Sequence, residues 1–342
     1  MTVETAVRPA AADRAFHDSL IVIDGLQYSN WDREVFEEMR AGGVTCAHVT
    51  LVIWEDARAT LDVIGKWHRL FREHADLIVP VRSAEEIEAA KRAGRTGILF
   101  GTQNASLFED DLALVQVFHD LGVRIVQLTY NNQNLVGSSC YEANDSGLSR
   151  YGKLVVREMN RVGMIVDCSH VGERTTLDAI EASARPIAIT HANPSSIFPH
   201  RRNKSDRVLE ALAERGGILG CAPYPHLTGG SEVSLEKWCE MVARTIDLMG
   251  ADHVAIGSDA SRKWTDEYLM WIRMGRWTHE PDYGAGTKEQ AGWLPWPEFF
   301  QTPADFPNLT AGLIARGLTT DDVAKVLGGN WLRFFRDGFR PA

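Results

Sequence analysis

The stretch that decides the fold runs from Met164 to His191 and reads MIVDCSHVGERTTLDAIEASARPIAITH. It contains two short apolar runs, Met164–Val166 and Ile187–Ile189, and a histidine follows each run, His170 and His191 respectively. The interval between the runs has the length and composition of a helix with its turns, which predicts a strand, a helix and a second strand. Because parallel strands joined in this way place their carboxyl ends at one edge of a sheet, we expect the two histidines to converge.

Two converging imidazoles indicate a metal site, because neutral histidine is a common metal ligand. Taken alone, either histidine could instead be a polar residue at a strand end that hydrogen-bonds the next loop. Histidine at both of two adjacent strand ends favours metal ligation over this structural alternative.

The composition is that of a globular protein. The chain has 342 residues, of which 44% are hydrophobic and 24% charged, enough for one large domain or two medium ones. Every apolar run is short, so we expect no membrane span, and the first dozen residues lack the basic start and apolar core of a signal peptide. We therefore predict a flexible N-terminal tail over residues 1–15, a single domain over residues 16–342 and a cytoplasmic location.

The cysteines argue against a disulfide framework or a structural zinc site, and the net charge argues against a nucleic-acid partner. The five cysteines are odd in number and lack CxxC spacing, which is typical of reduced thiols rather than of a disulfide framework or a structural zinc site. The net charge is −10, without a basic cluster, which argues against a nucleic-acid partner. The partner we expect is a small molecule.

The alternation of β-like runs and amphipathic segments predicts a (β/α)8 barrel. Repeated alternation of this kind indicates a parallel sheet, and the length of the chain suits a barrel with one insertion. A doubly wound open sheet is the alternative, but no GxGxxG follows the first run to support nucleotide binding. The β-like runs are Leu20–Asp24, Val44–Ile53, Gly97–Thr102, Val123–Thr129, Met164–Cys168, Ile187–Thr190, Gly217–Cys221 and His253–Gly257.

An insertion rich in aromatic residues follows the eighth run, over about residues 261–306. At the catalytic end of a barrel, such a segment would cover the substrate or form a subunit contact, or it would only make a small core of its own. Its aromatic residues are Trp264, Tyr268, Trp271, Trp277, Tyr283, Trp293, Trp296, Phe299, Phe300 and Phe306.

Candidate site residues follow the β-like runs, because the reactive groups of a barrel lie at the carboxyl ends of its strands. Two histidines, a carboxamide and a carboxylate there suit a hydrolytic site for one metal ion, with a position left for water. Asp259 would take the proton from that water, unless it serves only to cap a loop or helix. The polar residues past the runs include Asp24, Gln27, Tyr28, Gln103, Asn104, Tyr130, Asn131, His170, His191, Asn193, Tyr224, His226 and Asp259.

Four motifs together resemble the renal or membrane dipeptidase family, a branch of the amidohydrolase-like barrels. They are GMIVDCSHVGERTTLDAIEASARPIAITHANPSSI, RRNKSDRVLEALAERGGILG, HVAIGSD and GGNWLRFF. The likeness extends from about Ile21 to Phe335, and it implies a barrel of the metallo-dependent hydrolase type. It also leads us to expect a homodimer.

The resemblance implies roles for several residues. Members of this family hold two zinc ions with a His-x-Asp pair on the first strand, a bridging Glu after the third, a His after the fifth and sixth, and an Asp after the eighth. The later ligands correspond to His170, His191 and Asp259. The Arg-Asn pair that meets the substrate carboxylate corresponds to Arg202 and Asn203.

Four positions depart from the family pattern. Leu26 and Tyr28 replace the His-x-Asp pair, Gln103 replaces the bridging glutamate, and Tyr130 replaces a substrate-binding histidine. Leucine has no lone pair to offer, and a phenol is a poor ligand at neutral pH. We therefore expect the two-metal centre to be absent. Tyr28, Tyr130 and Asn131 would contact the substrate, unless the two tyrosines only fill the vacated volume.

Three functions stay open. In the first, a dipeptidase-like hydrolase holds one divalent metal ion, zinc, on His170, His191 and Gln103. Asp259 is its base, and it cleaves an amide or peptide-type bond of a small substrate whose carboxylate meets Arg202. In the second, no metal binds, and the histidines and Asp259 perform acid–base chemistry as an isomerase, lyase or decarboxylase of a small acid. In the third, the barrel binds a small molecule without turning it over.

Overall fold

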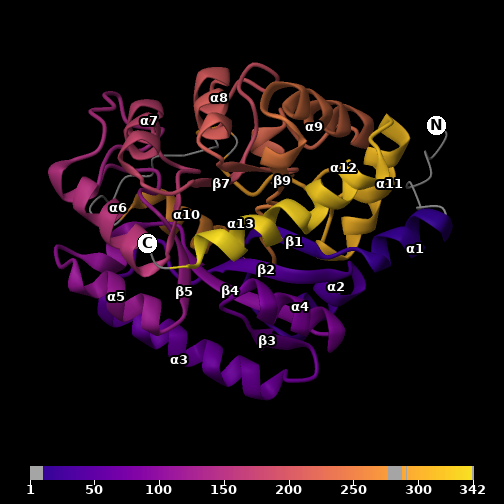
Figure 1. Ribbon diagram of the computed structural model, residues 1–342, viewed down its shortest axis with the longest axis horizontal. Coiled ribbons are helices and arrows are strands. Elements are labelled where there is room, and N and C mark those ends of the chain that lie inside the picture. Colours follow the sequence, from indigo (N-terminus) through magenta and orange to yellow (C-terminus); the bar gives the residue numbers. More distant parts are fainter. Residues whose placement is uncertain (1–10, 276–286, 290, 341–342) are drawn as a thin grey trace.

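The computed structural model describes residues 11–275, 287–289 and 291–340 (Figure 1). Eight parallel strands follow one another in the order β1-β2-β4-β5-β6-β7-β8-β9, and all eight overlap the expected runs. They are β1 (Val22–Gln27), β2 (Val44–Thr50), β4 (Thr96–Thr102), β5 (Val123–Gln127), β6 (Ile165–Asp167), β7 (Ala188–Ala192), β8 (Ile218–Cys221) and β9 (Val254–Ile256).

Strand β3 (Ile78–Pro80) pairs with β4 outside this order and was not predicted. It has three residues and ends in proline, so it is too short to give a periodic signal.

Backbone hydrogen bonds bring the two ends of the sheet together. The amide of Asp259 donates to the Leu26 carbonyl (3.1 Å), and the amide of Tyr28 donates to the Ala260 carbonyl (2.9 Å). A parallel bridge also joins Gln27 to Ala260. The sheet therefore forms a nearly closed barrel, which confirms the predicted fold, and the segment that closes it carries Asp259.

The helices surround the sheet, and the N-terminal helix α1 packs beside the late helix α11 (Figure 1), where His17 Nδ1 lies 2.7 Å from Thr310 Oγ1. Helix α1 begins at Ala11, so residues 11–15 of the expected tail are helical, while residues 1–10 lie outside the described residues. The bounds are α1 (Ala11–Ser19), α2 (Arg33–Ala41), α3 (Ala57–Glu73), α4 (Ala84–Arg92), α5 (Ala113–Asp120), α6 (Arg150–Val162), α7 (Glu173–Ala182), α8 (Asp206–Glu214), α9 (Leu235–Met249), α10 (Asp266–Met274), α11 (Phe306–Arg316), α12 (Thr320–Ala324) and α13 (Asn330–Gly338).

Side-chain caps explain where several of these helices begin. The side chains of Asp32, Asp56 and Ser83 accept backbone N–H groups at the starts of α2, α3 and α4. Ser205 and Ser234 do the same for α8 and α9. Each cap satisfies an N–H group that has no partner inside the helix, which fixes the first turn.

The barrel has an apolar end and a polar end. Trp331 of α13 is fully buried among inward-facing strand residues such as Ile23 and Ile218, and its indole N–H donates to the Ile256 carbonyl (2.8 Å). The five cysteines are free thiols, as predicted. None of the described helices combines the length and the apolar character needed to cross a membrane. The polar end, at the carboxyl termini of the strands, is where the candidate site lies.

Candidate active site

The two histidines converge as predicted. His170 follows β6 and His191 lies in β7, and their Nε2 atoms are 3.1 Å apart. Both side chains are buried. The strand–helix–strand unit read from the sequence therefore brings these rings together.

Hydrogen bonds at the far side of each ring fix its orientation. The hydroxyl of Thr190 donates to Asp167 Oδ2 (2.8 Å), so it accepts from His191 Nδ1–H (2.8 Å). Asn131 Oδ1 accepts from His170 Nδ1–H (2.7 Å). These tautomers are assigned from the hydrogen-bond network. They leave the Nε2 lone pairs of both rings directed at each other.

This arrangement fits a metal ion. Two lone pairs 3.1 Å apart repel each other unless a cation lies between or beside them. Two nitrogens that each bind zinc at about 2.0–2.1 Å with tetrahedral geometry are separated by roughly 3.3 Å. Burial, with the nearby Arg202 charge, holds the pKa of both imidazoles well below the usual value, so they stay neutral and able to bind. Hydrogen bonds from Nδ1 to polar partners are also typical of metal-binding histidines.

The further ligand that we expect, Gln103, is neutral. Among the described residues, no group of three or more His, Cys, Asp and Glu side chains could hold an ion. Gln103 lines the same cavity as His170, and its amide N–H donates to Thr50 Oγ1 (3.1 Å), which leaves its carbonyl oxygen available. A carboxamide oxygen gives the ion no charge, so we expect weaker binding than a glutamate would provide.

Asp259 lies at the same end of the barrel with a raised pKa. Its accessible surface faces the cavity, and the surrounding protein otherwise desolvates the carboxylate. Burial raises the pKa to about 7, against the opposing effect of Arg202 and with a smaller contribution from Asp24. Its backbone has a φ of 56°, and that of Asn131 a φ of 54°. Both are in the left-handed region, which is uncommon for non-glycine residues and is enriched at functional sites.

Asp24 supports the segment that carries Asp259. Its buried carboxylate accepts hydrogen bonds from the Ser258 amide (2.7 Å), the Ser258 hydroxyl (2.5 Å) and the Gln27 amide group (2.8 Å). Burial raises the pKa of Asp24 to about 6 despite these bonds. The first-strand aspartate therefore acts as an anchor for the last strand.

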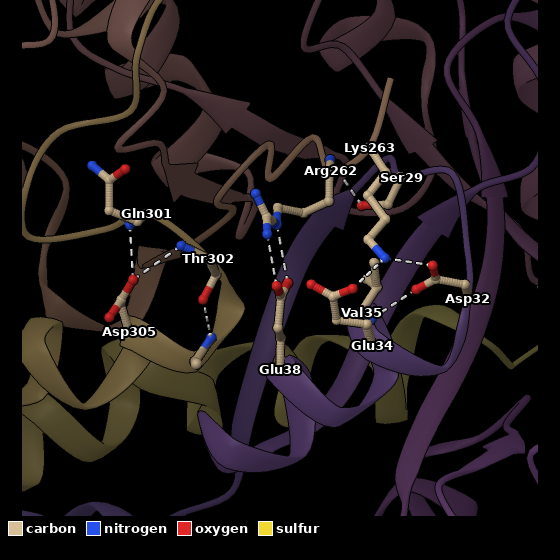
Figure 2. Close-up of polar contacts among 11 residues, drawn as sticks. Ser29, Asp32, Glu34, Val35, Glu38, Arg262, Lys263, Gln301, Thr302 and Asp305 are labelled. Atoms are coloured by element: carbon tan, nitrogen blue, oxygen red, sulfur yellow. Dashed lines mark hydrogen bonds and ion pairs between the residues drawn. The ribbon is translucent and has the colours of Figure 1, made fainter. Parts of the chain in front are cut away.

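A second set of contacts holds the same segment from outside (Figure 2). Arg262 makes two hydrogen bonds to Glu38 of α2, at 3.0 and 2.7 Å, and Lys263 contacts both Asp32 and Glu34 at 2.5 Å. Each pair is partly exposed and is worth little by itself. Together they fix the chain on the C-terminal side of Asp259 as Ser258 fixes it on the other side.

The candidate residues surround one small cavity of about 50 Å³. The sequence predicts a metal-binding, catalytic or substrate-binding role for nine residues. Seven of these nine line the cavity, and His191 adjoins it through His170. Asn203 does not line it, because its carboxamide accepts from the Asn193 amide and donates to the Phe198 and Leu227 carbonyls. The lining residues are Tyr28, Gln103, Tyr130, Asn131, Tyr141, His170, Arg202, Tyr224, Asp259, Ser261, Leu269, Ile272, Arg273 and Trp293.

Helix α10 and Trp293 form the roof of this cavity. Leu269 and Ile272 of α10 pack with Tyr28 and Tyr130 in one buried cluster. The insertion therefore covers the site. Trp277 and Tyr283, which the sequence placed in the same insertion, lie outside the described residues.

Three polar residues of the cavity, Tyr141, Ser261 and Arg273, were not predicted from the sequence. The Tyr141 hydroxyl is buried and makes no hydrogen bond within the described part of the chain. Tyr141 lies in the long loop after β5, and Ser261 and Arg273 lie in the insertion. None of these positions follows a strand directly, and only residues at the strand ends of a barrel are expected in its site.

A nearly closed parallel barrel with two histidines at its carboxyl end defines a barrel of the metallo-dependent hydrolase type. Residues 26–263 match the model of membrane dipeptidase, Peptidase family M19, and the chain belongs to this family.

The relatives agree with this assignment. Dipeptidase verJ of Clonostachys rogersoniana is 32% identical over 282 residues, which are 82% of this chain and 65% of the relative. Dipeptidase tcpJ of Claviceps purpurea is 29% identical over 284 residues, 82% of this chain and 60% of the relative. The chain thus spans less than two thirds of the length of these curated relatives.

Solved structures share the fold. An amidohydrolase from Pseudomonas aeruginosa superposes with a TM-score of 0.91 at 39% identity, over 96% of this chain and 99% of that one. A metallo peptidase from Rhodobacter sphaeroides, liganded with a phosphinate mimic of the dipeptide L-Ala-D-Ala, gives a TM-score of 0.75 at 19% identity, over 92% and 98% of the two chains. At that identity the likeness is evidence for the fold alone.

Proposed function

We propose that the protein is a dipeptidase-like hydrolase that cleaves an amide or peptide-type bond of a small substrate bearing a carboxylate, using one divalent metal ion. The observation that carries the proposal is the pair of Nε2 lone pairs, 3.1 Å apart, on imidazoles fixed from behind by Thr190 and Asn131. Family membership and the 39% identity to an amidohydrolase support it.

His170, His191 and the Gln103 oxygen would hold the ion, which we expect to be zinc. When bound, such an ion supplies a Lewis acid and an activated water. Asp259 lies beside the same cavity, and its raised pKa suits a group that accepts the proton of the attacking water near neutral pH.

Arg202 would orient the substrate. Its guanidinium donates to the Ser169 and His191 carbonyls, which holds it against both histidine segments, and it also lines the cavity. A guanidinium in this position matches the geometry of a substrate carboxylate. The homodimer, the single domain and the cytoplasmic location stay predictions from the sequence.

A metal-free acid–base enzyme is the second candidate. The described residues offer no third ionisable ligand, and Asp259 titrates near neutral pH, as an acid–base catalyst would. An isomerase, lyase or decarboxylase of a small acid would use the same carboxylate and Arg202. Metal content separates the two candidates.

The deciding experiment is elemental analysis of the protein purified without chelators. We expect about one divalent ion per chain, lost in His170→Ala and kept in His68→Ala, which removes an exposed histidine of α3. Absence of stoichiometric metal, even after incubation with zinc, would overturn the metal-dependent hydrolase and favour the metal-free enzyme.

Removal of the Tyr130 hydroxyl is expected to reduce turnover without affecting folding. Its ring stacks on His170 with centroids 4.2 Å apart and meets Trp54 edge-on, contacts that phenylalanine keeps. The hydroxyl makes no hydrogen bond to another described residue, so it is available to the substrate. For Tyr130→Phe we expect kcat to fall about tenfold and the melting temperature to stay within a few degrees. Unchanged kinetics would remove Tyr130 from the mechanism.

A further inference from the structure

A second cavity lies among the elements that surround the barrel. Helices α7 and α8 are neighbours outside the sheet (Figure 1), and residues of both line this cavity together with the loop after β5. Its volume is about 720 Å³, which is within the range of about 300–1,000 Å³ for small-molecule sites. The lining residues come from three segments, 139–145, 171–181 and 201–208. We call this space the outer cavity.

The outer cavity is separate from the candidate active site, although the two share a wall. In each of three segments of this wall, one residue lines the active site and its neighbour in the sequence lines the outer cavity. These pairs, with the active-site residue first, are Tyr141 and Cys140, His170 and Val171, and Arg202 and Asn203. A molecule in the outer cavity therefore lies behind the active site and does not take the place of the substrate.

Lys204 brings a buried positive charge to the outer cavity. The residue is only 3% exposed, and its Nζ donates to the Val171 carbonyl (2.7 Å). An ammonium group has three N–H donors, and within the described part of the chain this one makes no other hydrogen bond and no ion pair. A buried charge without a counterion is costly. A carboxylate in the cavity would supply the missing partner.

The charges that line the outer cavity are largely separated by sign. Segment 201–208 contributes three basic residues and no acidic one, namely Arg201, Lys204 and Arg207. The other two segments contribute one basic residue, Arg174, and the acidic residues Glu142, Asp145, Glu173, Asp178 and Glu181. Among the described residues, no ion pair joins any two of these side chains. Opposite charges thus face one cavity without neutralising each other, which suits a ligand that carries both charges.

Glu173 is the acidic residue best placed to act together with Lys204. It comes two residues after Val171, whose carbonyl accepts the Lys204 bond, whereas Glu181 lies about two turns further along α7. The Glu173 carboxylate makes no hydrogen bond or ion pair with any residue that the structure describes. The carboxylates of Glu142, Asp145 and Asp178 already accept backbone N–H groups.

We propose that the outer cavity is a second ligand site, which binds a small α-amino acid with its carboxylate on Lys204 and its ammonium group on Glu173. An α-amino acid carries both charges on one carbon atom, so it suits two charged side chains that meet at one short segment of backbone. Each contact is a charge-assisted hydrogen bond. A multivalent anion such as phosphate fits less well, because the acidic residues of the same cavity repel it. This proposal does not rest on the proposed hydrolase.

Calorimetry with three matched compounds tests the proposal. L-Alanine carries both charges, propionate lacks the ammonium group, and L-alaninamide lacks the carboxylate. With the full chain, we expect L-alanine to bind about tenfold or more tightly than either of the others. The advantage over propionate should vanish in Glu173→Gln, and the advantage over L-alaninamide should vanish in Lys204→Gln. L-Alanine bound in the active site would survive both substitutions, so equal affinities in the wild type, or unchanged binding in either variant, would overturn the proposal.

Two control variants keep the test decisive. Glu210→Gln of α8 and Arg244→Gln of α9 remove exposed charges that do not line the outer cavity, and both should bind L-alanine as the wild type does. If Lys204→Gln fails to fold, Arg207→Gln takes its place, because Arg207 is exposed and carries the same charge at the same cavity. We then expect a loss of about threefold in affinity for L-alanine, and no loss would count against the proposal.

The outcome is independent of catalysis, because the titrations involve no turnover. A protein that hydrolyses no peptide but binds L-alanine through Lys204 and Glu173 would overturn only the proposed hydrolase. A protein that hydrolyses peptides but binds L-alanine equally well in Glu173→Gln would overturn only the second ligand site.

Discussion

The Asp259→Asn variant is expected to lose about 10²- to 10⁴-fold in kcat while it folds as the wild type does. Asparagine has the shape of aspartate but cannot accept the proton of the attacking water. The bonds that position this segment come from the Asp259 amide, Ser258 and Arg262, so the substitution leaves them in place. Steady-state kinetics with metal-loaded protein measures the effect. The exposed Asp247→Asn of α9 is the matched control, and activity of Asp259→Asn near that of the control would exclude Asp259 as the base.

The pH dependence of kcat/KM is expected to follow the ionisation of the Asp259 carboxylate. Burial raises the pKa of Asp259 to about 7, and the base must be deprotonated. We expect kcat/KM to fall about tenfold per pH unit below pH 7 and to reach a plateau above it. The histidines do not contribute this limb, because their pKa values lie well below the usual range. A profile that stays flat from pH 8 to pH 5 would contradict the assignment.

Stability should change with pH in the opposite sense to activity. The folded pKa of Asp259 is above its usual value of 3.8, so the folded state binds more protons than the unfolded state between pH 3.8 and about 7. Its contribution to stability is therefore greatest below the unfolded pKa and is lost as the pH rises to about 7. Asp259→Asn removes this dependence, so we expect its melting temperature at pH 8 to match or exceed that of the wild type.

The sequence predicted the parts of the site that follow directly from strand ends. His170 and His191 converge because parallel strands fix where the next residue lies, and Asp259 follows the same rule at the end of β9. To find the residues that follow the strands, only the apolar runs and their spacing are needed, and both can be read from the amino-acid sequence. The eight strands of the barrel were predicted for the same reason.

The roof of the site could not be predicted in this way. Arg273 reaches the cavity because Leu269 and Ile272 pack on Tyr28 and Tyr130, residues more than a hundred positions away in the sequence. A short helix in an irregular aromatic segment gives no periodic signal that fixes such contacts. The substrate role that the resemblance implies for Asn203 stays a prediction, and the structure shows its carboxamide bonded to backbone groups of neighbouring segments.

Three glycines lie so close to the Thr190 carbonyl oxygen that no other residue type fits at their positions. The sequence motifs contain these glycines, but the reason for them becomes visible only in the structure. A Cβ atom on Gly257 would lie 1.7 Å from the Thr190 oxygen, and one on Gly220 would lie 2.0 Å from it. One on Gly25 would lie 2.8 Å from the same oxygen. Real Cβ atoms do not approach an oxygen so closely, so three strands reach this peptide only because each places a glycine there. The peptide joins Thr190 to His191, so the close packing sets the position of a proposed metal ligand.

The Gly257→Ala variant is therefore expected to destabilise the protein by roughly 3 kcal/mol or more, because the clash is with backbone that cannot rotate away. The folded fraction should also bind the metal ion more weakly, since the strand that carries His191 must shift to admit the methyl group. Urea denaturation and metal titration measure the two effects.

Gly65→Ala is the control. Gly65 lies within α3 with nothing within 4 Å of an added Cβ, so this variant should be more stable than the wild type by about 0.5–1 kcal/mol. A Gly257→Ala protein within 1 kcal/mol of the wild type would show that the strands can separate at no great cost. The three glycines would then not be what holds His191 in place.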